Sequence, residues 1–250
     1  MQSMLHWEDA KANRAMFAEK LKDQQGGTDL IVLPEMFTTG FSMNTSLAET
    51  MDGPTVKWMQ EQAAVLDAAI YGSVIISAEG RVFNRGLFVT PEGTVVYYDK
   101  RHLFRFAKET DHFDPGSDRI VVEWRDWKVL LQICFDLRFP VFSRNRGDYD
   151  AALYVANWPE TRSYPWSQLL IARAIENQCY VVGVNRVGMD GKGIHYSGDS
   201  VAIDPKGQVM GACTPAHECI SHATFDAAAL VDFRAKFPVG TEADDFELKP

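Results

Sequence analysis

Short, continuous apolar runs alternate along this chain with segments in which apolar residues recur every three or four positions. Continuous runs of about four to eight residues predict strands that are buried on both faces, and the helical spacing predicts amphipathic helices. The segments expected to form helices are 9–25, 55–69 and 163–178. The runs expected to form strands are 29–33, 70–78, 81–90, 94–98, 121–124, 127–134, 151–156, 179–184, 196–203, 208–212 and 217–225.

This alternation predicts an α/β protein. Strands with continuous apolar runs, interleaved with helices, indicate sheets that are covered on both sides. Short turn signals join some neighbouring strands, as at residues 204–207 (DPKG), so the sheets should be mixed rather than all parallel. We find no fixed-period repeat, low-complexity segment or linker, and we therefore expect one domain over residues 1–250.

Two helices carry more detailed signals. Asp9 is a suitable N-cap for the first helix, and the pair Gly26-Gly27 should end it. The helix over 163–178 should turn four apolar residues inward, namely Leu169, Leu170, Ala174 and Ile175.

Composition narrows the class of protein. The 250 residues are 46% apolar and 24% charged, with a formal net charge of -9 and scattered basic residues, which disfavours nucleic acid and anionic membranes as partners. No run is long and apolar enough for a membrane span, and no secretory signal pattern is present. The cysteines at 134, 179, 213 and 219 are far apart in sequence and do not form a disulfide pattern, so we expect a reducing, cytoplasmic location.

Polar residues follow the predicted strands at three places. Glu35 comes directly after the strand at 29–33, Lys100 follows 94–98, and Cys134 ends 127–134. Glu109 lies in the segment 100–118, which we expect to be an ordered loop over a cleft because aromatic residues accompany its charges. Strand ends at one edge of an α/β sheet meet in space and commonly form its ligand site.

A thiol, an amine and a carboxylate together suit acyl transfer. The carboxylate can take the thiol proton, the thiolate can attack a carbonyl carbon, and the ammonium can stabilise the oxyanion with a backbone N–H. Cys134 lies between a buried strand and an expected helix, whose N–H groups and dipole should lower the pKa of the thiol. A packed core cysteine explains this segment alone equally well.

Three segments, in this order, resemble the nitrilase superfamily of carbon–nitrogen hydrolases over nearly the whole chain: 33–37 (LPEMF), 98–104 (YDKRHLF) and 134–140 (CFDLRFP). Residues 157–159 (NWP) and 173–177 (RAIEN) add to the match. Residues 100–116 are most similar to the omega-amidase branch, which hydrolyses the terminal amide of 2-oxo acids such as 2-oxoglutaramate. The resemblance implies a four-layer αββα sandwich, a homodimer, a small-molecule amide substrate and no cofactor.

The resemblance also assigns roles to residues. It makes Glu35 the general base, Cys134 the nucleophile, and Lys100 the group that stabilises the tetrahedral intermediate together with the N–H of Phe135. Glu109 matches a further glutamate that orients the lysine and the substrate amide.

Candidates for substrate binding are less distinctive. Phe37, Phe41 and Trp158 could line the pocket, although aromatic core packing is equally compatible with them. Arg138 could meet a substrate carboxylate, or it could pair structurally with Asp136.

A small cluster of metal-ligand residue types lies in the last predicted strand. Alternation places His217 and Cys219 on one face of that strand and His222 on the other, so we expect no metal site.

One departure from the family concerns the start of the chain. Relatives have a full strand before the residues that match 2–7, and here that strand is almost absent, which predicts an exposed sheet edge. Two alternative functions stay open: hydrolysis of another amide or of an N-carbamoyl amino acid within the same superfamily, and binding of a small molecule without catalysis.

Overall fold

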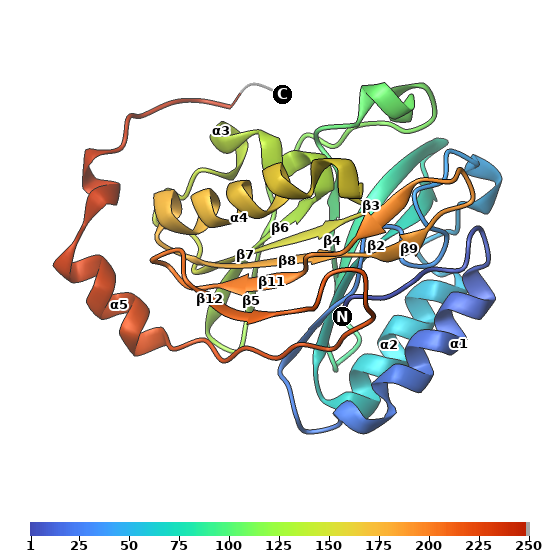
Figure 1. Ribbon diagram of the computed structural model, residues 1–250, viewed down its shortest axis with the longest axis horizontal. Helices are drawn as coiled ribbons and strands as arrows, with labels where there is room; N and C mark the ends of the chain where they lie inside the picture. The colour runs from blue at the N-terminus through green and yellow to red at the C-terminus, as the bar shows by residue number, and fades with distance from the viewer. Residues whose placement is uncertain (249–250) are drawn as a thin grey trace.

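The computed structural model describes residues 1–248 and contains two sheets packed face to face (Figure 1). Helices α1 (Ala10–Leu21) and α2 (Pro54–Leu66) cover the outer face of one sheet, and α4 (Ser163–Asn177) covers the outer face of the other. The predicted four-layer αββα sandwich of two mixed sheets is confirmed. Residues 249 and 250 of the expected domain lie outside the described residues.

The first sheet has the order β1-β2-β3-β4. β1 pairs with β2 in parallel, and the other two pairings are antiparallel. On its outer face, Ile70 and Leu87 pack against Phe17 of α1 and Met59 of α2 in one apolar cluster. The strands are β1 (Leu30–Val32), β2 (Ala69–Ala78), β3 (Arg81–Val89) and β4 (Val95–Asp99).

The second sheet has the order β12-β11-β8-β7-β6-β5, with a parallel centre formed by β6, β7 and β8. A separate hairpin pairs β9 with β10. The strands of the sheet are β5 (Val121–Trp124), β6 (Trp127–Ile133), β7 (Ala151–Ala156), β8 (Tyr180–Asn185), β11 (Val201–Ile203) and β12 (Val209–Ala212). The hairpin consists of β9 (Val187–Met189) and β10 (His195–Ser197).

The inner faces of the two sheets form the larger apolar cluster. Tyr71 and Phe88 from the first sheet pack with Leu131 and Val155 from the second. The Tyr71 hydroxyl crosses the interface and donates to the carbonyl of Gln132 at 3.0 Å. Burying this apolar surface contributes most of the free energy that holds the sheets together.

The three helices predicted from the apolar spacing are present, although α1 ends at Leu21, before the expected end at Gly26 and Gly27. The Asp9 carboxylate accepts the N–H of Ala12 at 2.9 Å, which confirms it as the N-cap of α1. In α4, Leu170 and Ala174 point inward as expected, but Ile175 is 50% exposed because it lies on the outer side of the helix. Helix α5 (Ala227–Lys236) has no counterpart in the predicted pattern, and only its Leu230 is buried.

Two strand predictions are wrong. The run 196–203 is interrupted at Gly198, whose φ of +80° ends β10 before β11 begins in the other sheet. The run 217–225 forms no strand; it contributes a single antiparallel bridge in which Cys219 and Gln2 exchange backbone hydrogen bonds.

A cavity beside residues 217–225 explains why this run does not form the predicted strand. A cavity of about 450 Å³ lies between the outer edge of β1, at Leu30 and Val32, and the segment 221–225. Met1 lies at this cavity, where its ammonium donates to the carbonyl of Val32 at 2.8 Å. Residues 2 and 4 make isolated bridges rather than a strand. Among the described residues, β1 therefore has β2 as its only strand partner, and 221–225 has none. We call this space the N-terminal cavity.

Candidate active site

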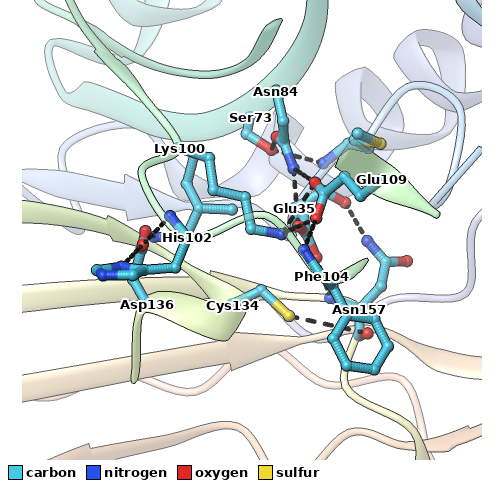
Figure 2. A network of polar contacts seen from close by, with 12 residues as sticks. Glu35, Ser73, Asn84, Lys100, His102, Phe104, Glu109, Cys134, Asp136 and Asn157 are labelled. Atoms are coloured by element: carbon cyan, nitrogen blue, oxygen red, sulfur yellow. Dashed lines mark hydrogen bonds and ion pairs between the residues drawn. The ribbon is translucent and has the colours of Figure 1, made fainter. Parts of the chain in front are cut away.

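Side chains from both sheets converge at one edge of the sandwich (Figure 2). Glu35 follows β1, and Lys100 follows β4, so the first sheet supplies both of these groups. Cys134 follows β6, and Asn157 follows β7, so the second sheet supplies the thiol and its neighbour. The predicted convergence of strand ends is thus present, and Glu109 reaches the same place from the loop after β4.

The backbone at Cys134 has a conformation that is unusual for a side chain of its type. Its φ is +46°, in the left-handed region, and the chain turns there from β6 into the 3₁₀ turn Cys134–Arg138. Such a residue carries roughly 1–2 kcal/mol of conformational cost, which is typical of sites where function fixes the geometry. The α-helix expected directly after Cys134 is absent; a short helix α3 (Pro140–Ser143) begins later.

Lys100 lies between two carboxylates. Its Nζ is 2.9 Å from Oε1 of Glu35 and 3.0 Å from each carboxylate oxygen of Glu109. All three side chains are fully buried. Because an unpaired charge in such a position is very costly, each of these groups depends on the others to stay ionised.

Asn84 on β3 fixes both carboxylates from the opposite side. Its Nδ2 donates to Oε1 of Glu35 at 2.8 Å and to Oε1 of Glu109 at 3.1 Å. Its own Oδ1 accepts a hydrogen bond from the hydroxyl of Ser73 at 2.8 Å, which determines which end of the amide faces the acids. The Ser73 hydroxyl in turn accepts the N–H of Met36 at 2.8 Å, so the network closes on the residue next to Glu35.

Asn157 connects the acid to the thiol. Its backbone N–H donates to Oε2 of Glu35 at 2.8 Å, and its Nδ2 donates to the main-chain oxygen of Glu35 at 2.6 Å. The carbonyl of Asn157 is 4.0 Å from Sγ of Cys134. The base and the nucleophile are therefore held by the same residue.

Burial and neighbouring charge act in opposite directions on Lys100. Burial alone would lower its pKa, but the carboxylates of Glu109 and Glu35 outweigh burial and raise the pKa above its usual value. For Glu109, burial raises the pKa of the carboxyl, and Glu35 adds to this while Lys100 opposes it. We conclude that Lys100 is an ammonium at neutral pH.

The thiol behaves differently from the sequence-based expectation. Burial, together with the carboxylates of Glu35 and Glu109, raises the pKa of Cys134 well above its ordinary value, although Lys100 opposes the change. The expected lowering by a helix is wrong, because the turn that follows is a short 3₁₀ turn and Cys134 is only 8% exposed. A resting thiol of this kind needs a base to remove its proton.

Phe135 is the second residue of the turn, where a helix leaves its N–H groups without partners inside the helix. Its ring packs edge-on against Phe104 at 5.0 Å and against Phe139 at 5.2 Å between centroids. The expected position of its N–H, directly after the thiol, is compatible with a donor to an oxyanion.

Asp136 holds the turn in place and does not pair with Arg138. Its Oδ2 accepts the Tyr98 hydroxyl at 2.7 Å and the N–H of Ile133 at 2.9 Å. Its Oδ1 lies 2.8 Å from Nδ1 of His102 and accepts the N–H of the same residue at 3.0 Å. The buried carboxylate thus joins β4, the loop after it and the end of β6.

The predicted substrate-binding residues lie in different places. Phe37 is fully buried on the helix side of the first sheet, where it packs on Phe17 at 5.6 Å and Trp58 at 5.8 Å, so the structure corrects its assignment to the pocket. Trp158 directly follows Asn157, and the exposed Arg138 lies 5.0 Å over its ring.

The ring of Phe41 does reach the site, 5.3 Å from Nζ of Lys100. Phe37 and Phe41 both follow Glu35 closely, and nothing in the sequence pattern separates them.

Sequence reasoning overlooked the roles of Asn84 and Asn157. Asn84 is a buried amide at the centre of β3, next to Arg85, and a buried amide requires hydrogen-bond partners, which is a signal that could have been used. Asn157 directly follows the buried strand β7, just as Cys134 directly follows β6. Among residues 1–248 no cluster of three or more His, Cys, Asp or Glu side chains has the arrangement of a metal site.

Comparison with known proteins gives consistent matches. A family model described as carbon-nitrogen hydrolase matches residues 2–235. A protein named omega-amidase YafV from Escherichia coli K12 is 50% identical over 99% of this chain and 96% of its own length. A 2-oxoglutaramate amidase from Bacillus subtilis is 34% identical over 84% of this chain and 83% of its own.

A solved structure gives a match of similar extent. The crystal structure of XC1258 from Xanthomonas campestris, described as a CN-hydrolase superfamily protein with an arsenic adduct in its active site, has a TM-score of 0.97 and 48% identity. The match covers 99% of this chain and 97% of that one.

Proposed function

This chain belongs to the carbon–nitrogen hydrolase family, and from that premise we propose that it hydrolyses the terminal amide of 2-oxo acid amides of the 2-oxoglutaramate type. The products are the free acid and ammonia. The observation that carries the proposal is the buried ammonium of Lys100 between Glu35 and Glu109, at the strand ends that also hold Cys134. The names of the omega-amidase and 2-oxoglutaramate amidase relatives support the choice of substrate.

In the first half of the proposed reaction, Glu35 takes the proton of the Cys134 thiol while Sγ forms a bond to the amide carbon. The negative charge moves to the amide oxygen, where the Lys100 ammonium and the N–H of Phe135 stabilise it. Glu35 then gives its proton to the nitrogen as the C–N bond breaks. Ammonia leaves, and a thioester to Cys134 remains.

In the second half, water attacks the thioester carbon and Glu35 takes one of its protons. The C–S bond breaks, the proton returns to sulfur, and the acid is released. Overall, one water is consumed for each amide, and the enzyme returns to its starting state. Because Glu35 acts as a base and then as an acid in each half, its fixation by Asn84 and Asn157 matters for both.

Glu109 does not exchange a proton in this scheme. It contacts Lys100 through both of its oxygens and accepts the N–H of Phe104 at 2.5 Å, so it orients the ammonium and ties the loop after β4 to the site. Trp158 and Arg138 form part of the substrate-binding wall in the proposal, and Arg138 contributes positive charge.

The experiment that tests the function is ammonia release by purified protein from 2-oxoglutaramate, with glutamine, a neutral amide and an N-carbamoyl amino acid for comparison. Activity concentrated on the 2-oxo acid amide supports the proposal, whereas preference for the N-carbamoyl substrate overturns it.

The matched variants for the mechanism are Cys134→Ala and Cys219→Ala. The first should abolish turnover and retain the circular dichroism spectrum, and the second, remote from the site, should keep its activity. Turnover that survives Cys134→Ala would exclude a thioester, and the absence of any activity in the unchanged protein would favour a binding role.

We further propose that the protein is a single domain that forms a homodimer, has no nucleic-acid or membrane partner, and is located in the cytoplasm. Three large apolar side chains are exposed on the outer layer, Tyr164 and Ile175 on α4 and Val141 on α3, which supports self-association. The four cysteines are unpaired, which suits a reducing compartment. No helix within residues 1–248 meets the length and hydropathy needed to cross a bilayer. Sedimentation velocity tests the dimer.

A further inference from the structure

The charges in the site pose a problem for an anionic substrate. Glu35 and Glu109 contribute two carboxylates, and Lys100 contributes one ammonium, so the buried group is not positively charged overall. A 2-oxo acid amide carries its own carboxylate, which would be repelled by this group unless a cation near the site compensates. The formal net charge of the whole chain is -9, so the chain provides no general attraction for an anionic substrate.

Arg162 is placed to provide that cation. Its guanidinium carbon lies 5.4 Å from the centre of the Phe104 ring. Phe104 belongs to the site, because its N–H donates to Glu109 and its ring packs edge-on against Phe135, the residue after Cys134, at 5.0 Å between centroids. The backbone of Arg162 is fixed as well, since its carbonyl accepts Nε1 of Trp158 at 2.7 Å.

The guanidinium of Arg162 also lacks an ionic partner. Within residues 1–248 it forms no ion pair with any carboxylate, in contrast to buried or half-buried arginines such as Arg85, Arg119 and Arg173. The side chain is half-buried rather than free in solvent. A half-buried arginine that rests on an aromatic ring and keeps its donors unused is well suited to bind a planar carboxylate with two parallel hydrogen bonds.

We propose that Arg162 binds the carboxylate of the substrate and thereby selects anionic amides, an inference that rests on the proposed function of the same site. The amide end of the substrate lies at Cys134, and the carboxylate end lies at Arg162, across the ring of Phe104. Arg162 is a specificity residue in this scheme, because it contacts the non-reacting end of the substrate. Arg138, on the ring of Trp158, is more exposed and strengthens the positive field at the same wall.

The test compares Arg162→Gln and Arg162→Lys on two amides of equal chain length, 2-oxoglutaramate and the neutral pentanamide. Hydrogen bonds to a charged group are worth about 1.5–3 kcal/mol, so Arg162→Gln should lower kcat/KM for the anionic amide by roughly 10- to 100-fold. The loss should appear mainly in KM and should be much smaller for the neutral amide. Arg162→Lys should recover part of the anionic preference, since it retains the charge without the planar fork.

The matched control is Arg105→Gln, an exposed arginine in the same loop as Phe104, which should leave the preference unchanged. Equal losses on both amides would show that Arg162 only supports the fold, and an unchanged preference would show that the carboxylate binds elsewhere; either result overturns the inference.

Failure of the proposed substrate is recognised separately. In that case the protein without substitutions does not hydrolyse 2-oxoglutaramate but does hydrolyse another anionic amide. In that case a loss in Arg162→Gln confined to the other anionic amide would still support the role of Arg162.

Discussion

Asn157 holds Glu35 at both ends: its backbone N–H binds the carboxylate at 2.8 Å, and its side-chain amide binds the main-chain oxygen at 2.6 Å. The same residue presents its carbonyl to Sγ of Cys134 at 4.0 Å. Because the carboxylate is fixed through a backbone N–H, no substitution at 157 other than proline can remove that bond directly. The side-chain bond, by contrast, can be removed alone.

We therefore expect Asn157→Ala to impair catalysis by loosening the base rather than by removing it. Loss of a buried hydrogen bond should lower the free energy of unfolding by about 1–3 kcal/mol, since the carbonyl of Glu35 loses its partner. The value of kcat should fall more than KM rises, because a displaced base acts in the transition state. Steady-state kinetics with urea denaturation measures both, and an unchanged kcat in a destabilised variant would show that Asn157 is only structural.

Replacing the base itself should have a larger effect. Glu35→Gln keeps the size of the side chain but cannot accept the thiol proton, so ammonia release should fall by roughly 10²–10⁴-fold. The exposed Glu61→Gln on α2 is the matched control and should retain full activity. Comparable rates in Glu35→Gln and the unchanged protein would mean that another group removes the proton.

Lys100→Met tests how far the Lys100 ammonium balances the charges of Glu35 and Glu109, because its loss should change the free energy of unfolding. It leaves two buried carboxylates without their cation, which should cost about 3–5 kcal/mol at neutral pH. In this variant the pKa of Glu109, which burial already raises and Lys100 opposes, should be higher in the folded than in the unfolded chain, so the folded state binds more protons. Stability should therefore rise as the pH falls from neutral towards 5. Urea denaturation at several pH values measures this, and stability that falls steadily on acidification would contradict the assignment.

The raised pKa of Cys134 predicts that the free enzyme holds a thiol, not a thiolate, at neutral pH. The difference in ultraviolet thiolate absorbance between the unchanged protein and Cys134→Ser should be absent near pH 7 and appear only in alkaline solution. A clear thiolate signal at neutral pH would mean that the resting enzyme is an ion pair of Cys134 with Lys100.

The N-terminal cavity predicts that an added strand would stabilise the protein. An extended segment of alternating apolar residues, joined directly before Met1, would meet the free edge of β1 and the unpaired segment 221–225. Burial of two large side chains should add about 3–6 kcal/mol before ordering costs, so we expect a measurable rise in Tm. An extension of equal length made of Gly and Ser is the control, and equal Tm values for the two would contradict the prediction.

Much of the fold was predictable because central strands such as β2, β7 and β8 are buried on both faces and therefore appear in the sequence as continuous apolar runs. The failures have specific causes. The run 217–225 has strand character but no neighbour to pair with, and pairing is not encoded locally. Gly198 divides one run between two sheets through a backbone angle that the pattern does not record. Helix α5 buries little more than Leu230, so its apolar periodicity was too weak to detect.

The part of the site that lies at the ends of predicted strands could be predicted from the sequence. Glu35, Lys100 and Cys134 each follow a predicted strand, and the structure brings them together. The direction of the Cys134 pKa was not predictable, because it depends on how deeply the thiol is buried and on two carboxylates that are distant in sequence. Phe37 and Phe41 lie four residues apart, and only the fold turns one into the helix layer and the other towards Lys100.

The division of the reactive groups between the two sheets has a consequence for assembly. A chain that has folded only one half of the sandwich holds either the acid and the ammonium or the sulfur, and neither half can carry out the chemistry alone. Catalytic activity therefore requires that the two sheets have packed against each other, and turnover can serve as a measure of that packing.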